Sequence, residues 1–127
     1  MSIYGIGTDI INVLRVGKIL RKNKIEFKKK IFTKKEIFYC DSKKNSDSYY
    51  AKRFAAKEAF VKALGTGFSK GITLKSIEVL RKDNGYPYLR LFGEAKKKAL
   101  KGGYESFNLS ISDTKEHSLA LVVVEGE

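Results

Sequence analysis

The chain has 127 residues and a formal net charge of +12, from 26 Lys and Arg against 14 Asp and Glu. This length favours one domain, over residues 1–127, and 43% hydrophobic with 31% charged residues argues against general disorder. Cys40 is the only cysteine, which excludes an intramolecular disulfide scaffold and favours a cytoplasmic location. The longest aliphatic run, Leu119 to Val124, is too short for a membrane span, and the first residues lack a signal-peptide pattern.

The positive charge is concentrated in one segment. Ten Lys and Arg residues lie between Arg15 and Lys35, opposed there only by Glu26. Such a run is either a solvated helix face or the contact surface for an anionic partner. Nucleic acid, a membrane surface, an acidic protein and a phosphorylated small molecule all have the required charge.

The first half of the chain is predicted to be mainly helical. Residues 3–9 read as a short strand, and the apolar spacing that follows predicts one helix over residues 12–30. Thr33 and Glu36 form a capping-box pattern, so a further helix starts there and should direct Ile37, Phe38 and Cys40 inward. After a polar loop over residues 41–48, an Ala-rich helix is expected over residues 48–64.

The second half is predicted to be mainly strands. Strands are expected over residues 72–80 and 88–92, joined by a turn at Asn84-Gly85. A helix over residues 94–101 is followed by strands over 107–111 and 119–124, with His117 on the turn between them. The last strand is continuously apolar and should be central in its sheet. The fold class is therefore α+β, with a largely antiparallel sheet and a long central helix.

Two acidic residues are candidates for metal chemistry. Phe54, Glu58 and Lys62 share one helix face, and Asp9 lies at the end of the first strand. Glu58 is either half of an exposed ion pair or a ligand of Mg²⁺, with lysines beside it, Lys57 and Lys62, for phosphate oxygens. Asp9 is either a helix N-cap or a second ligand. Gly5 and Gly7 would leave room beside Asp9 for a ligand.

Taken together, several motifs resemble the short, single-domain holo-acyl-carrier-protein synthase family of 4′-phosphopantetheinyl transferases. They are Gly5-Ile-Gly-Thr-Asp9-Ile with Arg15, Arg53-Phe-Ala-Ala-Lys-Glu-Ala with Lys62-Ala-Leu-Gly-Thr-Gly67, Gly85-Tyr-Pro87 and Leu109-Ser-Ile-Ser112. The resemblance implies transfer of 4′-phosphopantetheine from coenzyme A to a serine of apo-acyl-carrier protein, in fatty acid biosynthesis. It also implies a homotrimer with active sites between subunits.

The resemblance assigns roles to individual residues. Asp9 and Glu58 would bind Mg²⁺ and, with Lys62, form the catalytic centre. Coenzyme A would be bound by the set Arg53, Lys62, Gly65, Thr66, Gly67, Gly85, Pro87 and Ser110. The acidic carrier protein would contact the set Arg15, Ile19, Lys22 and Phe27.

One position departs from the family pattern. Members of the family commonly have a histidine after Ser-Ile-Ser, whereas this chain has Asp113. A carboxylate there would repel phosphates unless it is paired or metal-bound. Asp113 is therefore either a bystander at a turn or an addition to the metal or phosphate environment.

Two other functions stay open from the residues alone. The basic segment could bind nucleic acid through phosphate contacts, although it has little aromatic interleaving and no known motif. The chain could also be a trimeric interaction protein that has lost activity, with the Asp113 change as its support. The enzyme reading implies coenzyme A and acyl-carrier protein as partners, and neither nucleic acid nor membrane.

Overall fold

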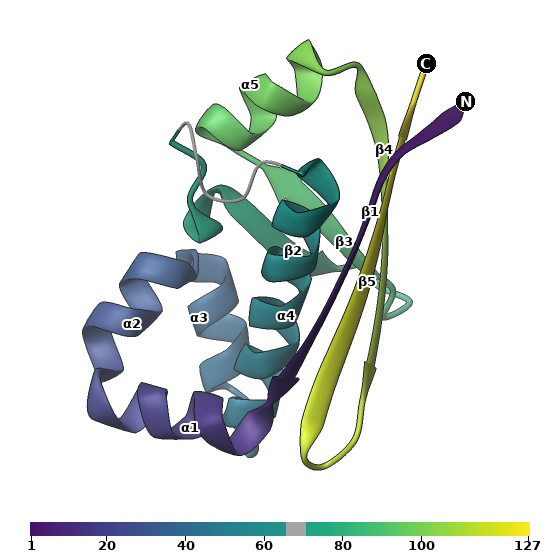
Figure 1. Cartoon of the computed structure of the whole chain (residues 1–127). Coiled ribbons are helices and arrows are strands. Elements are labelled where there is room, and N and C mark those ends of the chain that lie inside the picture. The colour runs from purple at the N-terminus through teal and green to yellow at the C-terminus, as the bar shows by residue number, and fades with distance from the viewer. Residues whose placement is uncertain (66–70) are drawn as a thin grey trace.

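The computed structural model describes residues 1–65 and 71–127, and its elements are arranged around one long helix (Figure 1). In the first half these are β1 (Ser2–Asn12), α1 (Val13–Lys22), α2 (Lys24–Ile31), α3 (Lys34–Asp41) and α4 (Ser46–Leu64). In the second half they are η1 (Leu74–Ser76), β2 (Ile77–Arg81), β3 (Pro87–Leu91), α5 (Gly93–Lys101), β4 (Tyr104–Asp113) and β5 (His117–Gly126). The α+β class and the antiparallel pairing expected from the sequence are confirmed.

A three-stranded antiparallel sheet in the order β1-β5-β4 covers one side of α4, and β2 pairs with β3 in a second sheet. The prediction that the last strand is central is therefore confirmed. Ala120, Val122 and Val124 of β5 are fully buried on the face toward α4, whereas Leu119 and Leu121 on the opposite face are 42% and 38% exposed. Of the two faces of this apolar strand, the domain core covers only one.

Small residues let β1 pack closely against α4. A Cβ atom added at Gly7 would lie 1.9 Å from the carbonyl oxygen of Ala59, and one at Gly5 would lie 1.9 Å from that of Ala63. The expectation that these glycines leave room for a ligand is therefore wrong, because the backbone of α4 occupies that space. Their role is to bring the strand that carries Asp9 up to the helix that carries Glu58.

The helical half differs from the prediction at two points. The single helix expected over residues 12–30 is interrupted at Asn23, whose φ of −121° and ψ of 44° are not helical. Asparagine is a poor helix former because its side chain competes for backbone hydrogen bonds. The inward placement of Phe38 is wrong, since its side chain is 82% exposed. The capping box of Thr33 and Glu36 is present, and Cys40 is buried as expected.

The strand half follows the prediction with shifted bounds. The strand expected from residue 72 begins only at Ile77, because Leu74–Ser76 forms a 3-10 turn. Gly85 has a φ of 85° in the turn between β2 and β3, which explains the Asn-Gly pair there. His117 is the first residue of β5 rather than part of the preceding turn, and α4 begins at Ser46, inside the predicted loop.

Candidate active site

Asp9, Glu58 and Lys62 come together where β1 packs against α4. Asp9 lies in register with the buried Ala120, so its side chain is on the sheet face toward α4. Glu58 and Lys62 are one turn apart on the helix, and the Lys62 Nζ lies 3.2 Å from the Asp9 Oδ1. Asp9 and Lys62, which are 53 positions apart in the sequence, thus form one charged cluster with Glu58, here called the carboxylate cluster.

The electrostatics of this cluster favour a cation. Burial, and then the negative charge of Asp9, raise the pKa of Glu58, while Lys62 opposes this. A divalent cation between these two carboxylates would stabilise the charged form of Glu58. Mg²⁺ is held in proteins by one or two carboxylates with water and phosphate oxygens. The pair fits such an ion, and no third Asp, Glu, His or Cys joins it among the described residues.

The raised pKa of Glu58 predicts a gain in stability when its charge is removed. A carboxyl group whose pKa is higher in the folded state destabilises the fold once the pH rises above its unfolded value. We expect Glu58→Gln to raise the Tm at pH 7 in metal-free buffer, with a gain that shrinks as the pH falls through the raised pKa of Glu58 and is lost below the ordinary glutamate pKa. Thermal unfolding across pH 4–8 measures this, and a Tm lowered at pH 7 would contradict it.

A mainly apolar groove lies beside Glu58. The aromatic residues Phe27 and Phe54 line it, together with Lys30, Ile31, Ile72, Thr73 and Leu74. The Phe27 ring lies 6.2 Å from that of Phe54 and 6.1 Å from that of the buried Phe32. Phe27, which the resemblance assigned to partner binding, is therefore also part of this wall.

A second pocket lies around Arg53 and shares no lining residue with the groove beside Glu58. Its walls carry Tyr49, Lys52, Arg53, Val79, Arg81, Gly85, Pro87, Ile111 and Asp113. Arg53 is 5% exposed, its guanidinium lies 4.5 Å from the centroid of the Tyr39 ring, and its Nη1 donates to the Tyr49 carbonyl oxygen. Three cations, Lys52, Arg53 and Arg81, make this pocket suited to an anion. Of the residues predicted to bind coenzyme A, it brings together Arg53, Gly85 and Pro87.

Asp113 lies in this second pocket and not beside Asp9 and Glu58. Its Oδ2 is 3.5 Å from the Nζ of Lys52, in a partly exposed ion pair. Within one chain, Asp113 is thus part of the surroundings of the anion pocket, and its charge is opposed by a lysine.

The remaining predicted residues that the structure describes lie on β4, at the end of α4 and on α1. Ser110 lies on β4 in register with Leu121, on the sheet face away from α4. Gly65 caps α4 in the left-handed region with a φ of 75°, and Thr66 and Gly67 lie outside the described residues. Arg15 and Lys22 are exposed on α1, and Ile19 is half-buried.

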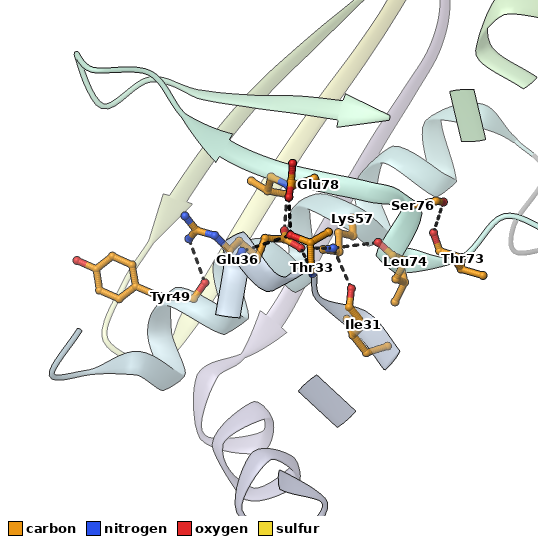
Figure 2. Close-up of polar contacts among 11 residues, drawn as sticks. Ile31, Thr33, Glu36, Tyr49, Lys57, Thr73, Leu74, Ser76 and Glu78 are labelled. Atoms are coloured by element: carbon orange, nitrogen blue, oxygen red, sulfur yellow. Dashed lines mark hydrogen bonds and ion pairs between the residues drawn. The ribbon is translucent and has the colours of Figure 1, made fainter. Parts of the chain in front are cut away.

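The main feature that the sequence reading misplaced is Lys57. Its side chain is fully buried, and its Nζ donates to the Glu36 carboxylate at 2.7 Å and to the carbonyl oxygens of Ile31 and Leu74 at 2.9 Å each (Figure 2). Lys57 is therefore not available to phosphate oxygens. Residues 57 and 58 project from α4 about 100° apart, so Glu58 can line the groove while Lys57 is buried. Lys52 and Arg81 of the anion pocket were also missed, since no motif marks them.

Comparison with known proteins identifies the class that these features define. The family model of the 4′-phosphopantetheinyl transferase superfamily matches residues 5–122. This range contains both the carboxylate cluster and the anion pocket. The chain therefore belongs to the 4′-phosphopantetheinyl transferase superfamily.

Individual relatives narrow the class further. A holo-[acyl-carrier-protein] synthase from Wolbachia pipientis is 46% identical over 96% of this chain and 97% of its own length. The crystal structure of the Neisseria meningitidis enzyme matches with a TM-score of 0.91 at 35% identity, over 98% of this chain and 99% of that one. The Helicobacter pylori enzyme, solved in complex with coenzyme A, matches with a TM-score of 0.83 at 31% identity, over 94% and 99%. The chain is an enzyme of this holo-acyl-carrier-protein synthase type, a phosphopantetheinyl transferase.

None of the helices in the described parts of the chain is long and apolar enough to cross a membrane.

Proposed function

We propose that residues 1–127 act as one catalytic domain that transfers 4′-phosphopantetheine from coenzyme A to a serine of apo-acyl-carrier protein and releases adenosine 3′,5′-bisphosphate. The observation that carries this proposal is the cluster of Asp9, Glu58 and Lys62 beside an apolar groove. The related Helicobacter pylori enzyme has been solved with coenzyme A, which has a pyrophosphate next to a long pantetheine arm. We infer that the reaction takes place in the cytoplasm and serves fatty acid biosynthesis.

Asp9 and Glu58 are the residues that would hold Mg²⁺. When bound, the ion supplies charge neutralisation at the attacked phosphate and the leaving bisphosphate. Lys62, which is 55% exposed and already contacts Asp9, is placed to exchange this carboxylate for a pyrophosphate oxygen. Because phosphoryl transfer depends mainly on positioning and charge stabilisation, these three side chains would contribute charge stabilisation at the reacting phosphate.

The pocket of Arg53, Gly85 and Pro87 is proposed to bind the phosphates of the nucleotide end of coenzyme A, with Gly65, Thr66, Gly67 and Ser110 also at the cofactor site. In one chain this pocket opens apart from the groove beside Glu58. We therefore propose that a complete site joins the carboxylate cluster of one subunit to the anion pocket of its neighbour in a homotrimer.

The open face of the three-stranded sheet is the surface proposed to form the trimer. Its apolar side chains include Ile6 and Ile10, which are 59% and 64% exposed, and Leu119 and Leu121. We expect Leu121→Lys to shift the protein from three chains to one, because it places a charge in the middle of this face. Light scattering on the purified protein measures the mass. The matched control is Phe38→Lys on α3, which removes a more exposed apolar side chain outside the sheet and should leave the trimer intact. Dissociation of both variants, or of neither, would contradict the proposal that the open sheet face forms the trimer.

The acidic carrier protein is proposed to dock on α1. Arg15 and Lys22 are exposed there, whereas Arg21 is engaged with Asp47 at 3.0 Å. We expect Arg15→Glu with Lys22→Glu to raise the KM for the carrier about tenfold at low salt, and to weaken its rise with ionic strength. Steady-state kinetics from 20 to 500 mM NaCl measure both effects.

The control for this prediction makes the same change in charge at the opposite end of the molecule. Lys96→Glu with Lys101→Glu alters α5, which Figure 1 shows far from α1. A carrier KM that rises equally in both double variants would mean that only net charge matters. A KM indifferent to salt in the unmodified protein would return the basic segment to an ordinary solvated surface.

Incubation with coenzyme A, Mg²⁺ and apo-acyl-carrier protein tests the proposed reaction. We expect adenosine 3′,5′-bisphosphate to be released in an amount equal to the carrier modified, and a chelator to stop it. Release that needs no carrier would contradict the proposal. Lack of release with any carrier from the same cell would leave nucleic-acid binding or an inactive trimer as the better account of the basic surface.

A further inference from the structure

Lys57 connects four segments of the chain by a single buried ammonium group. Besides α4, which carries it, the group reaches the carboxylate of Glu36 on α3, the carbonyl oxygen of Ile31 at the end of α2, and that of Leu74 in η1 (Figure 2). A lysine has three N–H donors and no acceptor, so these three bonds use its full capacity. The ammonium group therefore links α2, α3 and η1 to α4, although these segments are far apart in the sequence.

The two carbonyl groups belong to residues that line the groove beside Glu58. Ile31 and Leu74 are both in its wall, and each is held in place through its own backbone. Ile31 is the last residue of α2, where a carbonyl group has no later helical amide to accept from. The Lys57 ammonium supplies the missing donor and thereby fixes the distance between the α2 side and the η1 side of the groove.

We propose that Lys57 is a positioning residue that sets the width of the groove for the pantetheine arm of coenzyme A. This inference rests on the proposed function, because it takes coenzyme A as the ligand. Lys57 acts only through the two backbone segments, since its own side chain is fully buried. Its neighbour Glu58 lines the groove directly. Of these two adjacent positions of α4, Lys57 therefore holds the wall of the groove, and Glu58 belongs to the charged cluster.

Glu36 has a separable role in the same network. Its Oε1 accepts from Lys57 and from the backbone N–H of Thr33, and its Oε2 accepts from that of Val79 at 2.9 Å. The carboxylate therefore balances the buried charge and ties α3 to β2, without touching either carbonyl group of the groove. Removing Lys57 alone would leave Glu36 as an unpaired buried charge and endanger folding. A variant that removes Lys57 must therefore also remove the charge of Glu36, whereas in Glu36→Gln alone Lys57 still has the nearby negative charge of Glu78.

The informative comparison is between Lys57→Met with Glu36→Gln and Glu36→Gln alone. Both variants lose the ion pair, but only the double variant loses the donors to Ile31 and Leu74. Isothermal titration measures the affinity of each folded protein for coenzyme A and for adenosine 3′,5′-bisphosphate. The affinity for coenzyme A depends on the groove and on the rest of the site, whereas the affinity for the bisphosphate depends only on the rest of the site. The bisphosphate has no pantetheine arm and serves as the internal control.

We expect the double variant to bind coenzyme A about tenfold more weakly, since two bonds from a charged donor are lost, and the bisphosphate with little change. Glu36→Gln alone should keep the ratio of the two affinities near that of the unmodified protein. In kinetics, the loss should appear mainly in the KM for coenzyme A. Equal weakening of both ligands, or a changed ratio in Glu36→Gln alone, would overturn the positioning role and leave a purely structural one.

A milder variant covers the case in which the double variant does not fold. Lys57→Gln with Glu36→Gln keeps an uncharged donor at position 57 and should give a smaller loss that is again selective for coenzyme A; a nonselective loss contradicts the proposal. Failure of the unmodified protein to bind or use coenzyme A is a different outcome, because it contradicts the proposed function itself. If the unmodified protein is an active transferase but the ratio of the two affinities is unchanged in either double variant, only the positioning role of Lys57 is contradicted, and the proposed function stands.

Discussion

Asp9→Asn and Glu58→Gln are each expected to lower kcat/KM for phosphopantetheine transfer at least about 100-fold, because each removes one of two carboxylates proposed to hold the cation. The structure makes the two residues interdependent, since the charge of Asp9 is one cause of the raised pKa of Glu58. Steady-state transfer assays over a range of Mg²⁺ concentrations measure the effect. Partial recovery at high Mg²⁺ would fit weakened metal binding.

The matched control is Asp113→Asn, a loss of the same charge in the other pocket. Asp113 pairs with Lys52 and not with the carboxylate cluster, so we expect a change of about threefold or less and no change in the Mg²⁺ dependence. Equal losses in all three variants would contradict this account, and would indicate that Asp113 belongs to the metal environment of the assembled enzyme.

Gly7→Ala is expected to be strongly damaging although it lies outside the charged cluster. The new methyl group would lie 1.9 Å from the Ala59 carbonyl oxygen and 2.6 Å from the Ala63 backbone nitrogen, so β1 and α4 must separate. We expect a loss of about 3 kcal/mol in the free energy of unfolding, or roughly 10 °C in Tm, and a larger loss of activity than of stability. Thermal unfolding and transfer assays on the same samples measure both.

The control for this prediction is Gly93→Ala at the start of α5. Gly93 has a φ of 53° and open space at its Cβ position, so alanine there meets backbone strain of about 1 kcal/mol without a collision. If activity falls in proportion to Tm in both variants, Gly7 matters only for folding. Loss of activity beyond the loss of stability in Gly7→Ala alone supports its role in placing Asp9 next to Glu58.

The sequence predicted the elements well where local chemistry determines them. The capping box at Thr33, the Asn-Gly turn before β3 and the central position of β5 are all present. It failed where long-range packing decides. The exposure of Phe38 depends on which face of α3 meets α4. The glycines of β1 could not be understood without knowing that a helix backbone approaches them.

The candidate site was predictable in part for the same reason. Helical spacing places Glu58 and Lys62 on one face, but their meeting with Asp9 requires the pairing of β1 with β5 and its packing on α4. Lys57 illustrates the limit most clearly. A lysine beside a glutamate in a basic helix gives no local sign of burial, because its partners lie 21, 26 and 17 residues away.

We propose that the carboxylate cluster of one subunit and the anion pocket of the next form one active site. Mixing Asp9→Asn chains with Arg53→Gln chains, by unfolding and refolding them together in equal amounts, tests it most directly. Each variant alone should be nearly inactive. Random mixed trimers should recover about a quarter of the unmodified activity, because one interface in four then pairs an intact cluster with an intact pocket. A mixture no more active than either variant alone would contradict the account.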